Sequence, residues 1–80
     1  NETTTMDKKT RHLYIACLET AKDDAENGYA DLFEVDDMIR LFDQIEEEGR
    51  DIEDVYIIGS NSIIDRVLES EGLIDKGEWL

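Results

Sequence analysis

The sequence predicts an α+β fold in the order β-β-α-β-α, with a three-stranded sheet covered on one face by two helices. Three observations predict this order: two short apolar runs separated by Asn-Gly, helical spacing after Asp36, and an apolar run before a last helical segment. With 80 residues, 40% of them hydrophobic, the chain can bury one small core. We therefore expect a single domain over residues 10–80 and a flexible arm over residues 1–9.

The first two predicted strands form a hairpin. Residues 12–19 are rich in Leu, Tyr, Ile and Cys, which is typical of a strand with both faces covered. Residues 22–28 have the composition of a turn, because Asn27-Gly28 adopts positive φ at little cost. Residues 29–35 then form the second short strand.

The first segment also fits a helix, and this alternative stays open. Four residues keep helical spacing there, namely Tyr14, Leu18, Ala21 and Ala25. Asn27-Gly28 would then end the helix instead of forming a hairpin turn. Under this interpretation residues 7–27 are helical and the fold is mostly α.

Periodicity, capping residues and glycines predict the remaining three elements. After Asp36 apolar residues recur at helical spacing, and Gly49 is placed to end that helix. Residues 54–58 form the strongest predicted strand, which we expect to be buried. A second helix is predicted from about Ser62 to Glu71, because a serine with an acid three residues later fits a capping box.

The charge of the chain is strongly negative and unevenly distributed. Twenty-two acids against eight bases give a formal net charge of -14. Residues 1–22 hold four bases and three acids, whereas residues 23–80 hold nineteen acids and four bases. Such a surface repels phosphates, which disfavours direct binding to nucleic acid or to an anionic membrane. The expected partner is therefore basic.

Targeting and redox features indicate a cytoplasmic protein in the host cell. The single cysteine, Cys17, lies in an apolar run of six residues, where a buried and inert thiol is the usual outcome. No apolar run is longer than this one, so no membrane span is expected. The first five residues lack the basic and apolar regions of a signal peptide.

Motifs for catalysis are weak. His12 is the only histidine, and a lone histidine in a strand is more often structural or solvated than catalytic. The connection at residues 59–62 lacks the lysine of a phosphate-binding loop and the second glycine of a nucleophile elbow. We therefore expect neither enzymatic activity nor a cofactor.

Residues 23–34 resemble an EF-hand calcium loop, with an acid first, an amide fifth, a glycine sixth, an acid ninth and a glutamate twelfth. The candidate calcium ligands are Asp23, Asn27, Tyr29, Asp31 and Glu34. Ala25 removes the ligand expected at the third position, and no second loop is visible. A solvated acidic loop is therefore the favoured interpretation.

The acids after Val35 form the candidate binding surface. Carboxylates three or four residues apart on a helix lie about 5 to 6 Å from one another. Duplex DNA presents one charge per ~1.7 Å of its axis, so a basic groove built for phosphates could accept such rows of carboxylates instead. The candidate partner-binding residues are Asp36, Asp37, Asp43, Glu46, Glu47, Glu48, Asp51, Glu53, Asp54, Asp65, Glu69 and Glu71.

Two segments carry a resemblance to a known family. Residues 11–18, Arg-His-Leu-Tyr-Ile-Ala-Cys-Leu, and residues 53–58, Glu-Asp-Val-Tyr-Ile-Ile, are placed like an opening and a returning strand around an acidic helix. In order and charge, residues 11–58 resemble the N-terminal module of ArdA-type antirestriction proteins, which are acidic DNA mimics carried by mobile elements. The resemblance implies an anti-defence function.

These observations favour a small non-enzymatic inhibitor from a phage or mobile element. It would act as a DNA mimic that occludes the nucleic-acid-binding surface of a basic protein, such as a restriction or CRISPR effector. One alternative is a cytoplasmic adaptor that binds its partner through apolar anchors at Trp79, Leu80 and Tyr29. The others are a degenerate calcium-binding protein and an acidic face that is only solvated.

Overall fold

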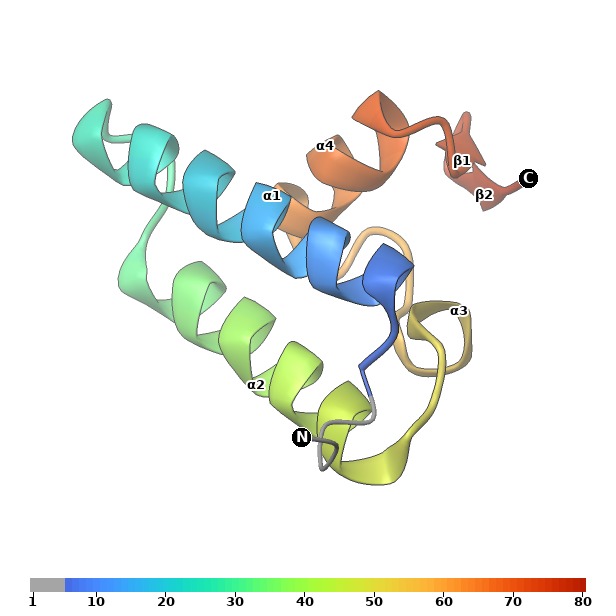
Figure 1. The fold of residues 1–80 in the computed structure, drawn as a ribbon. Coiled ribbons are helices and arrows are strands. Elements are labelled where there is room, and N and C mark those ends of the chain that lie inside the picture. Colours follow the sequence, from blue (N-terminus) through green and yellow to red (C-terminus); the bar gives the residue numbers. More distant parts are fainter. Residues whose placement is uncertain (1–5) are drawn as a thin grey trace.

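The computed structural model describes residues 6–80, in which helices dominate and a short hairpin follows the last of them (Figure 1). The elements in chain order are α1 (Lys8–Glu26), α2 (Leu32–Glu48), α3 (Ile52–Val55), α4 (Ser62–Ser70), β1 (Ile74–Asp75) and β2 (Glu78–Trp79). α1 and α2 run side by side in opposite directions, and α4 packs against both (Figure 1). α3 packs against α2.

The prediction of a three-stranded sheet is wrong. Within residues 6–80 the sheet has two antiparallel strands, β1 and β2, in which Ile74 pairs with Trp79. Neither strand coincides with a predicted one. The order is therefore four helices and a hairpin, and the alternative of a mostly α fold describes the protein.

Residues 12–19 lie inside α1, where burial follows the helical period. Leu13, Cys17 and Ala21 are four residues apart and buried, whereas Ile15 and Leu18 are exposed. The strand prediction failed because it took the apolar run to be covered on both faces. Asp7 begins the helix, since its carboxylate accepts a hydrogen bond from the Thr10 backbone N–H at 2.8 Å.

The other two predicted strands are also absent from the structure. Residues 29–35 form the connection into α2 and its first turn, which Asp31 caps by accepting a hydrogen bond from the Glu34 backbone N–H at 2.9 Å. Residues 54–58 contain the end of α3 and an irregular connection. Tyr56 is buried there as expected, but Ile57 is 76% exposed, so the run as a whole is not buried.

Both predicted helices are present, with refined ends. Gly49 ends α2 in the left-handed conformation, with φ 65°, as predicted. α4 begins at Ser62 as predicted, but its cap is Asn61, whose side-chain oxygen accepts hydrogen bonds from the backbone N–H groups of Ile63 and Ile64. The capping box predicted at Ser62 is therefore not formed.

The core lies between α1, α2 and α4. Met38 and Phe42 of α2 and Ile63 and Leu68 of α4 are fully buried in it. The rings of Tyr14 and Phe42 stack with centroids 4.8 Å apart, which joins α1 to α2. No helix within residues 6–80 has the length and apolar character needed to cross a membrane.

Residues 6–9, which the predicted arm includes, are part of the described structure. Met6 is buried with the core residues, and α1 already includes Lys8 and Lys9. Residues 1–5 of the predicted arm lie outside the described residues. The two segments that were expected as strands in the resemblance to antirestriction proteins, residues 11–18 and 53–58, are helical or irregular.

Candidate partner-binding surface

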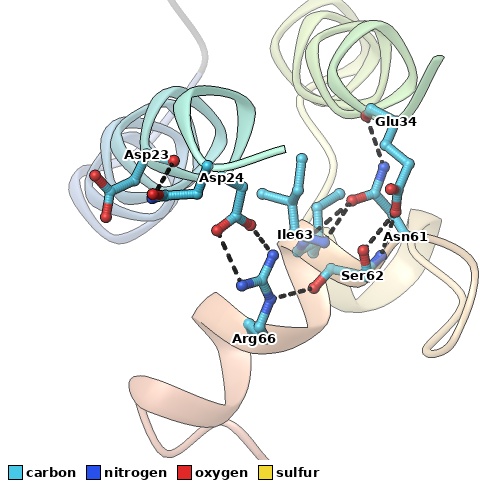
Figure 2. Close-up of polar contacts among 9 residues, drawn as sticks. Asp23, Asp24, Glu34, Asn61, Ser62, Ile63 and Arg66 are labelled. Carbon is cyan, nitrogen blue, oxygen red and sulfur yellow. Dashed lines mark hydrogen bonds and ion pairs between the residues drawn. The ribbon is translucent and has the colours of Figure 1, made fainter. Parts of the chain in front are cut away.

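Polar contacts between α2 and α4 fix the first turn of α2 (Figure 2). The Asn61 side-chain amide donates to the Glu34 carbonyl oxygen at 2.9 Å, while the Glu34 carboxylate accepts from both the backbone N–H and the hydroxyl of Ser62. Asn61 is buried and all of these contacts cross 27 or 28 residues of chain. Helix capping and tertiary attachment therefore come from the same side chain.

Tyr56 and Asp65 hold the Asn61 cap in place through further hydrogen bonds. The Tyr56 hydroxyl accepts a hydrogen bond from the Asn61 backbone N–H at 3.1 Å and donates to the Asp65 carboxylate. Asp65 also accepts from the Gly59 backbone N–H at 3.1 Å. Burial, and then the Asp65 hydrogen bond, raises the pKa of Tyr56. Asp65, one of the predicted partner-binding residues, is thus half-buried and held by hydrogen bonds within the fold.

A second attachment joins α1 to α4. The Arg66 guanidinium pairs with the carboxylate of Asp24, which is buried near the end of α1 (Figure 2). Arg66 Nε also donates to the Ser62 carbonyl oxygen at 3.4 Å. These attachments occupy the faces that α1 and α2 turn toward α4. The outer face of α2 is left for contact with other molecules.

Eleven of the twelve predicted partner-binding residues are exposed, and Asp65 is the exception. The structure divides the eleven into two groups. Glu69 lies in α4 and Glu71 is its C-cap, with the Glu71 carboxylate 3.2 Å from Nε2 of His12 on α1. The remaining nine lie on α2, on α3 and in the connection between them, and we call them the α2–α3 acidic surface: Asp36, Asp37, Asp43, Glu46, Glu47, Glu48, Asp51, Glu53 and Asp54.

Cations neutralise this surface incompletely. The ion pairs seen at it among residues 6–80 join Arg40 to Asp36 at 3.0 Å, Arg50 to Glu48 at 3.4 Å, and Lys9 to Glu53 at 3.8 Å. All three are solvent-exposed, and such pairs contribute about 0.2 to 1 kcal/mol at most sites. Five carboxylates form no ion pair with any of residues 6–80: Asp37, Asp43, Glu47, Asp51 and Asp54.

The negative field of α2 reaches the neighbouring helix. The pKa of Tyr14 on α1 is raised, first by burial and then by the charges of Asp43 and Glu46. Both carboxylates disfavour the phenolate because it would carry the same charge. The acidic surface therefore extends to the edge where α2 meets α1.

An apolar patch adjoins the acidic residues at the start of α2. Leu32 and Phe33 are each 84% exposed, and Tyr29 before them is exposed as well. Leu32 and Phe33 line an open hollow of about 530 Å³ together with Val35, Asp36 and Ile39. We call Tyr29, Leu32, Phe33, Val35 and Ile39 the apolar patch. Large apolar side chains exposed next to one another often mark a binding surface.

The sequence predicted this patch only in part. Among the three predicted anchors, Tyr29 belongs to it, Leu80 is exposed elsewhere, and Trp79 is partly buried against the core. Leu32 and Phe33 were assigned to a strand, so their exposure went unrecognised. The available signal was their position outside the stripe of Met38, Phe42 and Ile45.

The candidate calcium ligands do not converge on a common point. Asp23 lies within α1, before the helix ends at Glu26, and Asn27 caps that end by donating to the Asp23 carbonyl oxygen. Asp31 caps α2, and the Glu34 carboxylate is bound by Ser62. Within residues 6–80 no cluster of three or more histidine, cysteine or carboxylate side chains has the arrangement of a metal site.

The residues considered for catalysis are buried, exposed on a helix or part of a helix cap. Cys17 is buried, and burial raises the pKa of its thiol to about 12. His12 lies on the exposed side of α1 beside Glu71. The connection at residues 59–62 provides the cap of α4. None of these groups adjoins the hollow at the start of α2.

Comparison with protein-family models, with curated proteins and with solved structures found no match for this chain.

Proposed function

We propose that the protein is a small non-enzymatic inhibitor whose α2–α3 acidic surface mimics DNA. It occupies the nucleic-acid-binding groove of a basic protein, such as a restriction or CRISPR effector. The observation that carries this proposal is the clustering of nine exposed acids along α2, α3 and their connection, five of which form no ion pair with any of residues 6–80. Chain-wide acidity alone would not require such clustering.

The spacing of these acids supports binding in a groove. Asp36, Asp43 and Glu47 are separated by seven and four residues, so they form a row along one side of α2. The row is about 16 Å long at 1.5 Å per residue. Lysine and arginine side chains that bind successive phosphates could bind this row as well, at the expense of DNA.

The self-repulsion of such a surface also supports a function in binding. Like charges along one face destabilise the folded chain, and the effect is relieved when a basic partner covers them. Association with that partner should be fast at low ionic strength and slower in salt, because the long-range field steers the encounter.

The test begins with affinity capture from a host lysate, followed by purification of the captured protein. The partner should bind duplex DNA by itself and release it when this protein is added. Affinity should fall steeply between low and moderate salt. A ternary complex with DNA, or an affinity unchanged by salt, would contradict the DNA-mimic proposal.

A pair of double variants tests the surface directly. Asp43→Lys with Glu47→Lys should weaken inhibition at least tenfold, because close charge pairs at such interfaces couple by ~1.5 to 7 kcal/mol. Glu19→Lys with Glu26→Lys changes the net charge equally at exposed positions of α1. This control should inhibit like the parent, and equal losses in both variants would mean that only net charge matters.

The exposure of Leu32 and Phe33 favours a second candidate, an adaptor that binds its partner mainly through apolar contacts. Binding of this kind varies little with salt. Salt dependence therefore separates the two candidate functions.

A further inference from the structure

The apolar patch and the acidic row lie on one continuous side of α2. Asp36 belongs to both, because it lines the apolar hollow and begins the row that continues with Asp43 and Glu47. Phe33 precedes Asp36 by three residues and is thus its neighbour on the helix surface. A molecule bound along this side of α2 would contact apolar side chains at the start of the helix and carboxylates further along it.

The apolar patch is held in a fixed geometry. Glu34, which follows Phe33 directly, is bound through its carbonyl oxygen by Asn61 and through its carboxylate by Ser62. Asp31 caps the same turn. Leu32 and Phe33 are therefore exposed on a turn that is attached to α4, and little ordering entropy is lost there when a partner binds.

We propose that the apolar patch is the anchor site for a segment of the basic partner that carries an apolar side chain followed by lysines or arginines. This inference rests on the proposed function and deepens it, because it defines the chemistry of the segment. The apolar side chain occupies the hollow, and the cations pair with Asp36, Asp43 and Glu47.

Charge complementarity identifies this occupant. Asp36 lines the hollow, and Asp43 and Glu47, which form no ion pair with any of residues 6–80, follow it along the helix. In a symmetric dimer through this face, each copy would place the same carboxylates near those of the other, and each chain carries a net charge of -14. An apolar segment without cations would leave the carboxylates partly desolvated and without partners.

The test uses two synthetic helical peptides with the same number of lysines and arginines. One peptide, the anchored peptide, carries leucine and tryptophan at one end, and the charge-only peptide has serines at those positions. The wild-type protein should bind the anchored peptide at least tenfold more tightly in a fluorescence or NMR titration. Phe33→Ser and Leu32→Ser should remove that difference and leave the affinity for the charge-only peptide unchanged.

Ile57→Ser is the matched control, because Ile57 is 76% exposed but lies outside the apolar patch. It should bind both peptides like the wild type. Since all three substituted side chains are exposed, the variants should fold, which circular dichroism verifies.

Other results would overturn the inference. These are equal affinities of Phe33→Ser and wild type for the anchored peptide, equal binding of a neutral apolar peptide, or no binding of either peptide. A wild-type dimer that Phe33→Ser dissociates would identify a second copy as the occupant. The proposed function fails separately, if Asp43→Lys with Glu47→Lys leaves the affinity for the charge-only peptide unchanged.

Discussion

The two halves of α2 differ in what they present to solvent. The first half exposes Leu32 and Phe33 beside Asp36 and Asp37, and it is attached to α4 through Glu34. The second half exposes Asp43 and Glu47, which form no ion pair within residues 6–80. Apolar contacts act only at short range, whereas charges act over a Debye length of about 8 Å in physiological salt. One helix can therefore attract a charged partner with one end and bind its apolar side chain with the other.

The largest expected effect contrasts two phenylalanines in these halves. Phe42 is fully buried and stacks on Tyr14, so Phe42→Ala should lower the free energy of unfolding by about 3 to 5 kcal/mol. Phe33→Ala should change it by less than about 0.5 kcal/mol, because Phe33 is exposed. Urea denaturation measures both. A large loss at Phe33 would mean that the apolar patch serves the fold.

The next largest effect is expected from breaking the attachment of the first half of α2 to α4. Asn61→Ala removes the cap of α4 and the hydrogen bond to the Glu34 carbonyl oxygen, so we expect a loss of about 2 to 3 kcal/mol. Amide exchange should accelerate more at the start of α2 than at its end. The exposed Gln44→Ala is the control and should be neutral. Uniform acceleration along α2 would contradict a local attachment.

Salt should change the stability of the protein through the acidic second half of α2. Raising sodium chloride from about 0.01 M to about 1 M shortens the Debye length from about 30 Å to about 3 Å. The free energy of unfolding should rise by about 1 kcal/mol as repulsion is screened. Asp43→Lys with Glu47→Lys should be as stable as the wild type or more stable at low salt, and should respond less to salt. An equal response would place the repulsion elsewhere.

The smallest effect is the titration of Tyr14. Its pKa is raised in the folded state, so the stability it contributes is complete below about pH 10 and is lost as pH rises through the raised value. Asp43→Asn removes one cause and should lower the pKa of Tyr14. Tyrosinate absorbance measures the change, with Tyr14→Phe identifying the signal. An unchanged pKa would mean that Asp43 does not influence α1.

The sequence predicted those features that depend on local chemistry. Gly49 at the end of α2 and the start of α4 at Ser62 follow from backbone preference and helical spacing, and both are confirmed. The exposure of eleven acids was also predictable, because uncompensated carboxylates stay in water.

Features that depend on tertiary contacts could not be predicted from the sequence. Residues 12–19 fit either period in isolation, and packing against α4 decides for the helix. The role of Asn61 depends on Glu34, which is 27 residues away. The apolar patch was hidden because Leu32 and Phe33 have strand-like neighbours, although the turn that holds them is helical.

The ion pair between Asp24 and Arg66 has a consequence for the synthesis of the chain on the ribosome. It closes a loop of 42 residues, and α4 supplies the surface on which both long helices pack. While α4 is still inside the exit tunnel, α1 and α2 lack their common support and Phe42 stays partly uncovered. The chain should therefore fold only after α4 has emerged, which makes its folding late and cooperative rather than progressive during translation.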